Sequence, residues 1–132
     1  MFEYRLSVRG YELDSYNHVN NAVYLNYYEQ ARWEVMRQTG LLEKLQSQNI
    51  LLVVTEINIR YSREARLFDP ILIKSEVEFS GPYVVFKQRM INEDDGKKLS
   101  HATVKLIPLN GERVPCGISP EYEILLTKNK KN

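Results

Sequence analysis

Residues 14–32 read DSYNHVNNAVYLNYYEQAR, and the rest of the chain can be interpreted around this stretch. A carboxylate, a histidine and three asparagines stand directly before an aromatic-rich run. Asn20 or Asn21 suits a helix N-cap, because a short amide oxygen accepts the first unpaired helix N–H groups, and Gly40 suits the helix stop. The sequence therefore predicts a long helix with polar, potentially reactive groups at its N-terminus, where we expect the functional site.

The predicted helix carries bulky side chains on more than one face. One apolar face has three- and four-residue spacing and comprises Tyr24, Tyr28, Ala31 and Val35, while other faces carry Leu25, Trp33 and Met36. We therefore expect the helix to be buried on more than one side.

Alternating apolar and polar residues predict strands on both sides of this helix. They cover residues 2–8 before it and, after it, residues 50–62, 71–79, 84–90 and 99–107. A short helical extension is expected at 41–45 and a last helix at about 122–126, where Ser119-Pro120 resembles a helix start. Short connections favour antiparallel neighbours. The class is therefore α+β, with a curved sheet around one long helix inserted early in the chain.

Length and composition narrow the functional classes. The chain has 132 residues, which suits a single domain over 1–132, and residues 128–132 are expected to form a flexible tail. A net charge of +1 with interleaved basic and acidic residues argues against nucleic-acid binding. No signal peptide is recognisable, and the longest apolar run, residues 50–54, is too short to span a bilayer. The lone Cys116 cannot form an intrachain disulfide, so we expect a cytoplasmic protein.

The chain resembles the hot-dog-fold thioesterases of the 4-hydroxybenzoyl-CoA thioesterase type from residue 2 to about 115. The matching positions are Tyr11, Asp14, HVNN at 18–21, Tyr24, Tyr28, Glu29, Ala31, Arg32, Tyr61, RLFD at 66–69 and FKQRM at 86–90. The resemblance implies a helix wrapped by an antiparallel sheet and assembly into a homodimer or homotetramer. It also implies hydrolysis of acyl-CoA or acyl-ACP thioesters without a metal or cofactor.

The resemblance further implies roles for single residues. The family's catalytic carboxylate falls on Asp14, and its oxyanion donor, a backbone N–H in the first helical turn, falls on Asn21. The HVNN string is also similar to plant acyl-ACP thioesterases, which carry an Asn two residues before the His. Here Tyr16 occupies that position and the Asn stands at 17, so the sequence departs from that constellation.

These residue types suit thioester hydrolysis. Asp14 can act as a nucleophile through a mixed anhydride or as a base for water, and the sequence leaves both open. Free N–H groups at a helix N-terminus stabilise an oxyanion, and losing one such donor typically costs about a hundredfold or more in rate. The alternative for Asp14 is a loop-capping carboxylate. His18 either orients the thioester or water, or hydrogen-bonds the loop backbone.

Further residues are candidates for contact with the substrate. Those near the reacting centre and along the helix are Tyr16, Asn20, Tyr24 and Glu29, and those expected at the pocket mouth for the phosphates of CoA are Arg60, Arg63, Arg66 and Lys87. Glu29 is alternatively a partner for Arg32 or the Trp33 N–H, and each basic residue is alternatively a solvated strand-face charge. His101 lies mid-strand in an apolar context and is expected to be structural.

Two rival functions remain at this stage. A hot-dog hydratase or dehydratase is disfavoured by the spacing of Asp and His. A hot-dog domain that binds an acyl ligand or a protein without turnover is the non-enzymatic alternative.

Overall fold

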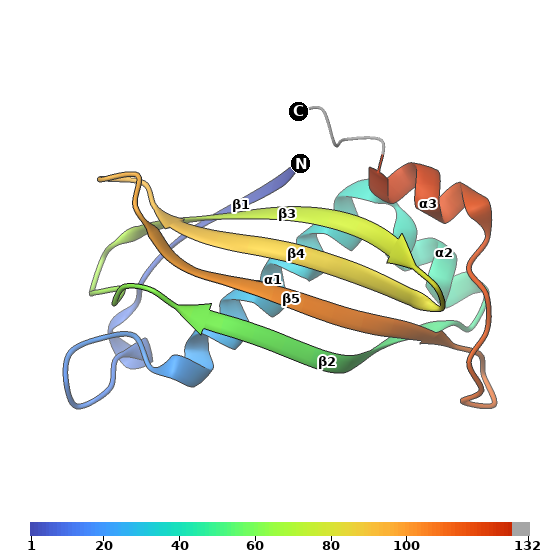
Figure 1. Ribbon diagram of the computed structural model, residues 1–132, viewed down its shortest axis with the longest axis horizontal. Coiled ribbons are helices and arrows are strands. Elements are labelled where there is room, and N and C mark those ends of the chain that lie inside the picture. Colours follow the sequence, from blue (N-terminus) through green and yellow to red (C-terminus); the bar gives the residue numbers. More distant parts are fainter. Residues whose placement is uncertain (128–132) are drawn as a thin grey trace.

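The computed structural model describes residues 1–127, so the tail expected at 128–132 lies outside the described residues. One five-stranded antiparallel sheet lies against one long helix (Figure 1). The elements are β1 Phe2–Ser7, the 3-10 turn η1 Gly10–Glu12, α1 Asn21–Thr39, α2 Leu41–Ser47, β2 Leu51–Tyr61, β3 Pro70–Ser80, β4 Tyr83–Asn92, β5 Lys98–Leu109 and α3 Pro120–Thr127. The predicted α+β hot-dog architecture is confirmed.

The ends of α1 follow the capping signals in the sequence. Asn20 is the N-cap, and its Oδ1 accepts a hydrogen bond from the Ala22 N–H at 2.9 Å. Gly40 ends the helix with a φ of 76°, a left-handed conformation that glycine adopts without a Cβ clash. Both predicted boundaries are confirmed.

The strand order is β1-β3-β4-β5-β2. The β3–β4 and β4–β5 pairs are hairpin neighbours, as the short connections predict. The pairs β1–β3 and β2–β5 join segments far apart in the sequence. The β2–β3 connection therefore crosses from one edge of the sheet toward the other, and β2 is an edge strand.

The predicted apolar face of α1 packs on the inner face of the sheet. Tyr24, Tyr28, Ala31 and Val35 are each at most 2% exposed. One core cluster lies around the N-terminal half of α1, and a second contains Val35 together with α2 and α3 residues. The helix is thus packed against a core cluster in both halves of its length.

A polar seam also fixes α1 against β4. The buried Arg32 donates from Nη1 to Gln88 Oε1 at 3.1 Å, and Gln88 Nε2 donates to the Tyr28 carbonyl at 3.2 Å and to Ser75 Oγ at 3.1 Å. Tyr28 Oη and Ser100 Oγ form a further buried hydrogen bond. Buried polar groups that satisfy each other define one helix position on the sheet, which holds the helix N-terminus in place.

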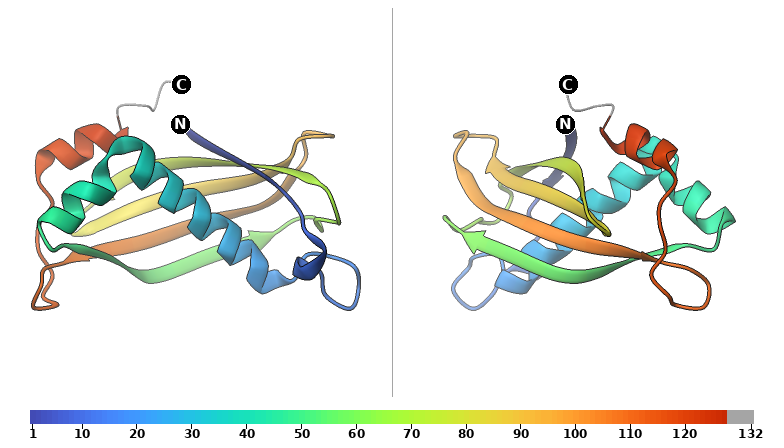
Figure 2. Two further views of the ribbon diagram at one scale, coloured as in Figure 1. Left: turned by 180° about the vertical axis from the view of Figure 1, so that it is seen from behind. Right: turned by 45° about the vertical axis from the view of Figure 1, so that its right-hand side comes forward.

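The expectation that α1 is buried on more than one side is only partly met. Met36 packs against the second core cluster, whereas Trp33 is 46% exposed. Seen from behind, α1 lies across the sheet with no further layer over it (Figure 2). The prediction is wrong for the Trp33 side, because this chain supplies only one sheet face for the helix to pack on.

Candidate active site

The loop before α1 is a tight turn held at its base. Leu13 and Val19 form an isolated antiparallel bridge, and the Asp14 N–H donates to the His18 carbonyl at 2.8 Å. Asn17, at the turn, has a φ of 64°, which asparagine tolerates better than most residues. The polar residues 14–18 are therefore displayed on a defined turn.

The Asp14 carboxylate is partly fixed by this turn. Its Oδ1 accepts hydrogen bonds from the Tyr16 N–H at 2.8 Å and the His18 N–H at 3.3 Å. Its Oδ2 has no hydrogen-bond partner within residues 1–127. Asp14 therefore does cap the loop, through Oδ1, and its Oδ2 remains available for chemistry.

The first turn of α1, which follows this loop, supplies a free donor. The Asn20 N–H is taken by the Glu12 carbonyl at 2.9 Å, and the Ala22 N–H by the N-cap side chain. The Asn21 N–H has no acceptor among the described residues, as expected for the first residue of a helix. A free N–H at the positive end of the helix dipole suits a developing oxyanion.

Asp14 and Asn21 line the same cavity, which has a volume of about 230 Å³. Its other lining residues are His18, Val19, Tyr24, Tyr61, Ser62, Arg63 and Glu64. The cavity thus lies between the loop, the start of α1 and the segment that follows β2. Five predicted site residues meet there: Asp14, His18, Asn21, Tyr24 and Arg63.

Tyr24 holds the segment after β2 in place. Its hydroxyl donates to the Arg63 carbonyl at 3.2 Å and accepts from the Ala65 N–H at 2.9 Å. Burial raises the pKa of Tyr24, so the hydroxyl keeps the proton that it donates. The Val19 N–H also donates to the Ala65 carbonyl at 2.9 Å. The two walls of the cavity are therefore joined through these hydrogen bonds.

Tyr61 is a cavity residue that sequence reasoning missed as a site residue. Its hydroxyl donates to the Asn21 carbonyl at 3.0 Å, and its ring meets that of Tyr24 edge-on with centroids 5.1 Å apart. It lies in the strand predicted over residues 50–62, and its place among the positions that match the family was the one signal that pointed to it.

Several predicted substrate-binding residues lie outside this cavity. The Tyr16 side chain is 77% exposed on the turn, Asn20 caps the helix, and Glu29 is exposed on α1. No hydrogen bond joins Glu29 to Arg32 or to the Trp33 N–H in the described structure. The negative charge of Glu29 nevertheless offsets part of the lowering of the Arg32 pKa by burial. Their sequence proximity to Asp14 or the helix did not place their side chains at the cavity.

The basic residues expected at the mouth divide between the two faces of the sheet. Arg63 lines the cavity, whereas Lys87 lines a hollow on the outer face, and Arg60 neighbours His101 in the outer row of side chains. Successive strand residues point to opposite faces, so Arg60 and Tyr61 point apart. His101 is exposed, with Nδ1 3.2 Å from Lys98 Nζ, so its predicted apolar setting is wrong.

Comparison with known proteins agrees with the fold. The Thioesterase-like superfamily matches residues 8–121. The long-chain acyl-CoA thioesterase FadM of Escherichia coli is 36% identical over 104 residues, covering 78% of this chain and 79% of that protein. The acyl-CoA thioesterase YbgC of Haemophilus influenzae is 32% identical over 108 residues, covering 80% of this chain and 78% of that protein.

A solved structure shows the same fold over nearly the full length. The probable thioesterase YbaW of Escherichia coli superposes with a TM-score of 0.87 at 30% identity, covering 96% of each chain. The family match includes the turn that carries Asp14, the whole of α1 and all of the sheet except β1. This chain therefore belongs to the thioesterase-like superfamily, a hot-dog family of thioester hydrolases.

Proposed function

We propose that this protein hydrolyses acyl-CoA thioesters in the cavity between the 14–18 turn, the start of α1 and the segment after β2. The observation that carries the proposal is that one cavity is lined by both Asp14, whose Oδ2 is free, and Asn21, whose N–H is free. Thioester hydrolysis needs both a group that delivers oxygen and a donor for the carbonyl oxygen. The relatives named acyl-CoA thioesterases support this substrate class.

Catalysis follows from the two groups. The thioester carbonyl accepts a hydrogen bond from the Asn21 N–H, which strengthens as the tetrahedral oxyanion forms. In the base route, Asp14 Oδ2 takes a proton from water as the water oxygen bonds to the carbonyl carbon. Collapse of the intermediate breaks the carbon–sulfur bond, and the leaving CoA thiolate takes up the proton that Asp14 holds. In the nucleophile route, Oδ2 attacks the carbonyl carbon, the carbon–sulfur bond breaks and the CoA thiolate leaves. Water then cleaves the resulting mixed anhydride, which releases the acid and regenerates Asp14.

His18 and Arg63 have supporting roles in this proposal. The His18 side chain lines the cavity without a hydrogen bond to any described residue, so it is free to orient the thioester or the water. Arg63 is exposed on the lip and suits a phosphate or pantetheine oxygen of the entering thioester. Tyr24 and Tyr61 also line this cavity.

We infer that the working enzyme is a homodimer or homotetramer. The described cavity of about 230 Å³ is below the usual range of ligand pockets, roughly 300–1,000 Å³, so an acyl chain must extend beyond it. The edge strand β2 exposes a row of apolar side chains, which are Leu51, Val53, Val54 and Ile57. A second copy on this edge would pair the free backbone groups and extend the acyl site.

The cellular setting is also part of the proposal. No helix of the described chain is long and apolar enough to cross a membrane. Cys116 is the only cysteine, and it is a free thiol. A protein that does not depend on disulfides suits a reducing compartment, so we place the reaction in the cytoplasm.

The decisive experiment compares Asp14→Asn with the unchanged protein in a thiol-release assay over short, long and aromatic acyl-CoAs and an acyl-ACP. The side-chain oxygen of the introduced amide can still accept the Tyr16 and His18 N–H bonds, so we expect normal folding with a loss of at least about a hundredfold in kcat. Unchanged turnover in the variant would refute the role of Asp14. Binding of CoA compounds without turnover by the unchanged protein would favour the non-catalytic alternative.

A further inference from the structure

A hollow lies on the outer face of the sheet, which is the face opposite α1 and toward the viewer in Figure 1. It has a volume of about 340 Å³. Its lining residues are Met1, Lys74, Glu76, Lys87, Gln88, Arg89, His101, Ala102 and Thr103. The hollow is separate from the cavity that holds Asp14, and the proposed hydrolysis does not use it.

A row of basic side chains lines this hollow and continues beyond it to Arg60 of β2. In the strand register, Lys74 of β3 is opposite Arg89 of β4, Arg89 is opposite His101 of β5, and His101 is opposite Arg60 of β2. Residues directly opposite one another share a face of the sheet, and like charges in such positions destabilise it. We call Lys74, Arg89, His101 and Arg60 the basic row. The charged Lys74 and Arg89 stand directly opposite each other, which costs stability and points to a use.

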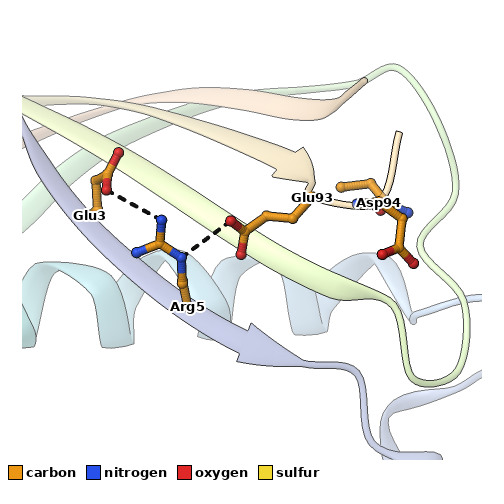
Figure 3. A network of polar contacts seen from close by, with 5 residues as sticks. Glu3, Arg5, Glu93 and Asp94 are labelled. Atoms are coloured by element: carbon orange, nitrogen blue, oxygen red, sulfur yellow. Dashed lines mark hydrogen bonds and ion pairs between the residues drawn. The ribbon is translucent and has the colours of Figure 1, made fainter. Parts of the chain in front are cut away.

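Three other cations on this face are paired with carboxylates, unlike those of the basic row. Arg5 of β1 lies between Glu3 at 3.5 Å and Glu93 at 3.2 Å (Figure 3). Lys87 pairs with Glu78 at 3.3 Å, and Lys105 pairs with Glu56 at 3.6 Å.

The charges of the basic row lack such partners. Lys74, Arg89 and Arg60 form no ion pair or side-chain hydrogen bond with any residue that the structure describes. Glu76 lines the hollow, and Glu3 is opposite Lys74 in the register but bonds to Arg5. Adding the Lys98 ammonium beside His101 leaves more positive than negative charge around the row.

We propose that the basic row is a binding site for a phosphate-bearing small molecule. The planar guanidinium of Arg89 can donate two hydrogen bonds to phosphate oxygens, and the Lys74 ammonium provides a compact positive charge beside it. The row spans three strand spacings, about 14 Å, which matches a ligand with more than one phosphate. A second copy of the same face is a poor occupant wherever its own basic row would meet this one, because the like charges repel.

Two sources of such phosphates are compatible with the row. Arg60 precedes Tyr61, which lines the thioester cavity on the other face, so the row begins at the sheet edge next to that cavity. The nucleotide end of a bound CoA thioester is therefore one source, and this reading rests on the proposed function. A separate phosphorylated effector is the other source, and it requires no hydrolysis at all.

The test measures binding of inorganic pyrophosphate by calorimetry at low salt, without any thioester present. We expect binding that becomes at least about tenfold weaker in the double variant Lys74→Gln/Arg89→Gln, because hydrogen bonds to charged groups are lost. Arg5→Gln is the matched control, since it removes a cation from the same face whose charge is already neutralised, and it should bind as the unchanged protein does. Binding that is absent at millimolar pyrophosphate, or equal in all three proteins, would overturn the site.

A competition experiment separates the two sources. If CoA displaces pyrophosphate and pantetheine does not, the row holds the nucleotide end of CoA, and the double variant should raise KM for acyl-CoA without raising it for acyl-pantetheine. If neither compound displaces pyrophosphate, the row serves a separate effector. Either result supports the site. Asp14→Asn should bind pyrophosphate normally, so failure of the hydrolysis proposal would not be mistaken for failure of this one.

Discussion

At the scale of single residues, Glu12 shows how the Asp14 turn is anchored. This carboxylate is only 6% exposed, and its Oε1 accepts from the Arg9 N–H at 2.8 Å and the Tyr27 hydroxyl at 2.7 Å. Its Oε2 accepts from Arg9 Nη2 at 2.6 Å, and its backbone carbonyl accepts from the Asn20 N–H. One residue thus ties the turn to both the helix cap and the second turn of α1.

The pH dependence of stability should report on this carboxylate. Burial alone would raise the pKa of Glu12, but the hydrogen bonds from Arg9 and Tyr27 outweigh it and hold the pKa below the ordinary value. A depressed folded-state pKa contributes stability that is present above the unfolded pKa and is lost as pH falls through the folded pKa. We expect Glu12→Gln to lose about 2 kcal/mol at pH 7 and less in acid, measured by urea unfolding. An equal loss at pH 7 and in acid would contradict the role of the charge.

At the scale of elements, the two ends of α1 provide a matched pair of substitutions. Asn20→Ala removes the N-cap bond and should cost about 1 kcal/mol of stability. Gly40→Ala forces a Cβ into a backbone with φ of 76° and should cost a similar amount, roughly 1 kcal/mol. Only the first change loosens the helical turn that presents the Asn21 N–H.

The expected difference is therefore in turnover. Asn20→Ala should lower kcat by about tenfold or more, because a loosened first turn holds the oxyanion donor less well. Gly40→Ala should leave kcat close to that of the unchanged protein. Steady-state kinetics below the unfolding temperature of both variants would check this. Equal kcat values in the two variants would argue against an oxyanion site at this end of α1.

At the scale of the whole molecule, the edge of the sheet should determine assembly. Ile57 of β2 is 40% exposed and Ile124 of α3 is 62% exposed. Ile57→Lys places a charge on the free edge and should convert the assembly to monomers with a loss of activity, because edge lysines oppose strand pairing. Ile124→Lys makes the same chemical change away from that edge and should leave both unaffected. Light scattering at micromolar concentration, with far-UV circular dichroism to check folding, measures the outcome; a stable monomer of the unchanged protein would refute the assembly proposal.

The sequence by itself determined the features that depend on neighbouring residues. Asn20 and Gly40 define the ends of α1 through capping and a left-handed backbone, and alternation defines the strands. The Asp14 turn had to stand at the N-terminus of α1, because only six residues separate Asp14 from Asn21. Local propensity and chain connectivity are sufficient for each of these features.

Tertiary structure alone decided what lies opposite that turn. The pairing of β2 with β5, and the hydrogen bonds of Tyr24 to residues 63 and 65, bring Tyr61 and Arg63 to Asp14. The same pairing places Arg60 on the outer face beside His101 and away from the cavity. A one-residue change of register reverses the face of every side chain in a strand, and register between distant segments is set by packing across the whole sheet. The groups that we propose react could therefore be located from the sequence, whereas the walls of their cavity and the basic row could not.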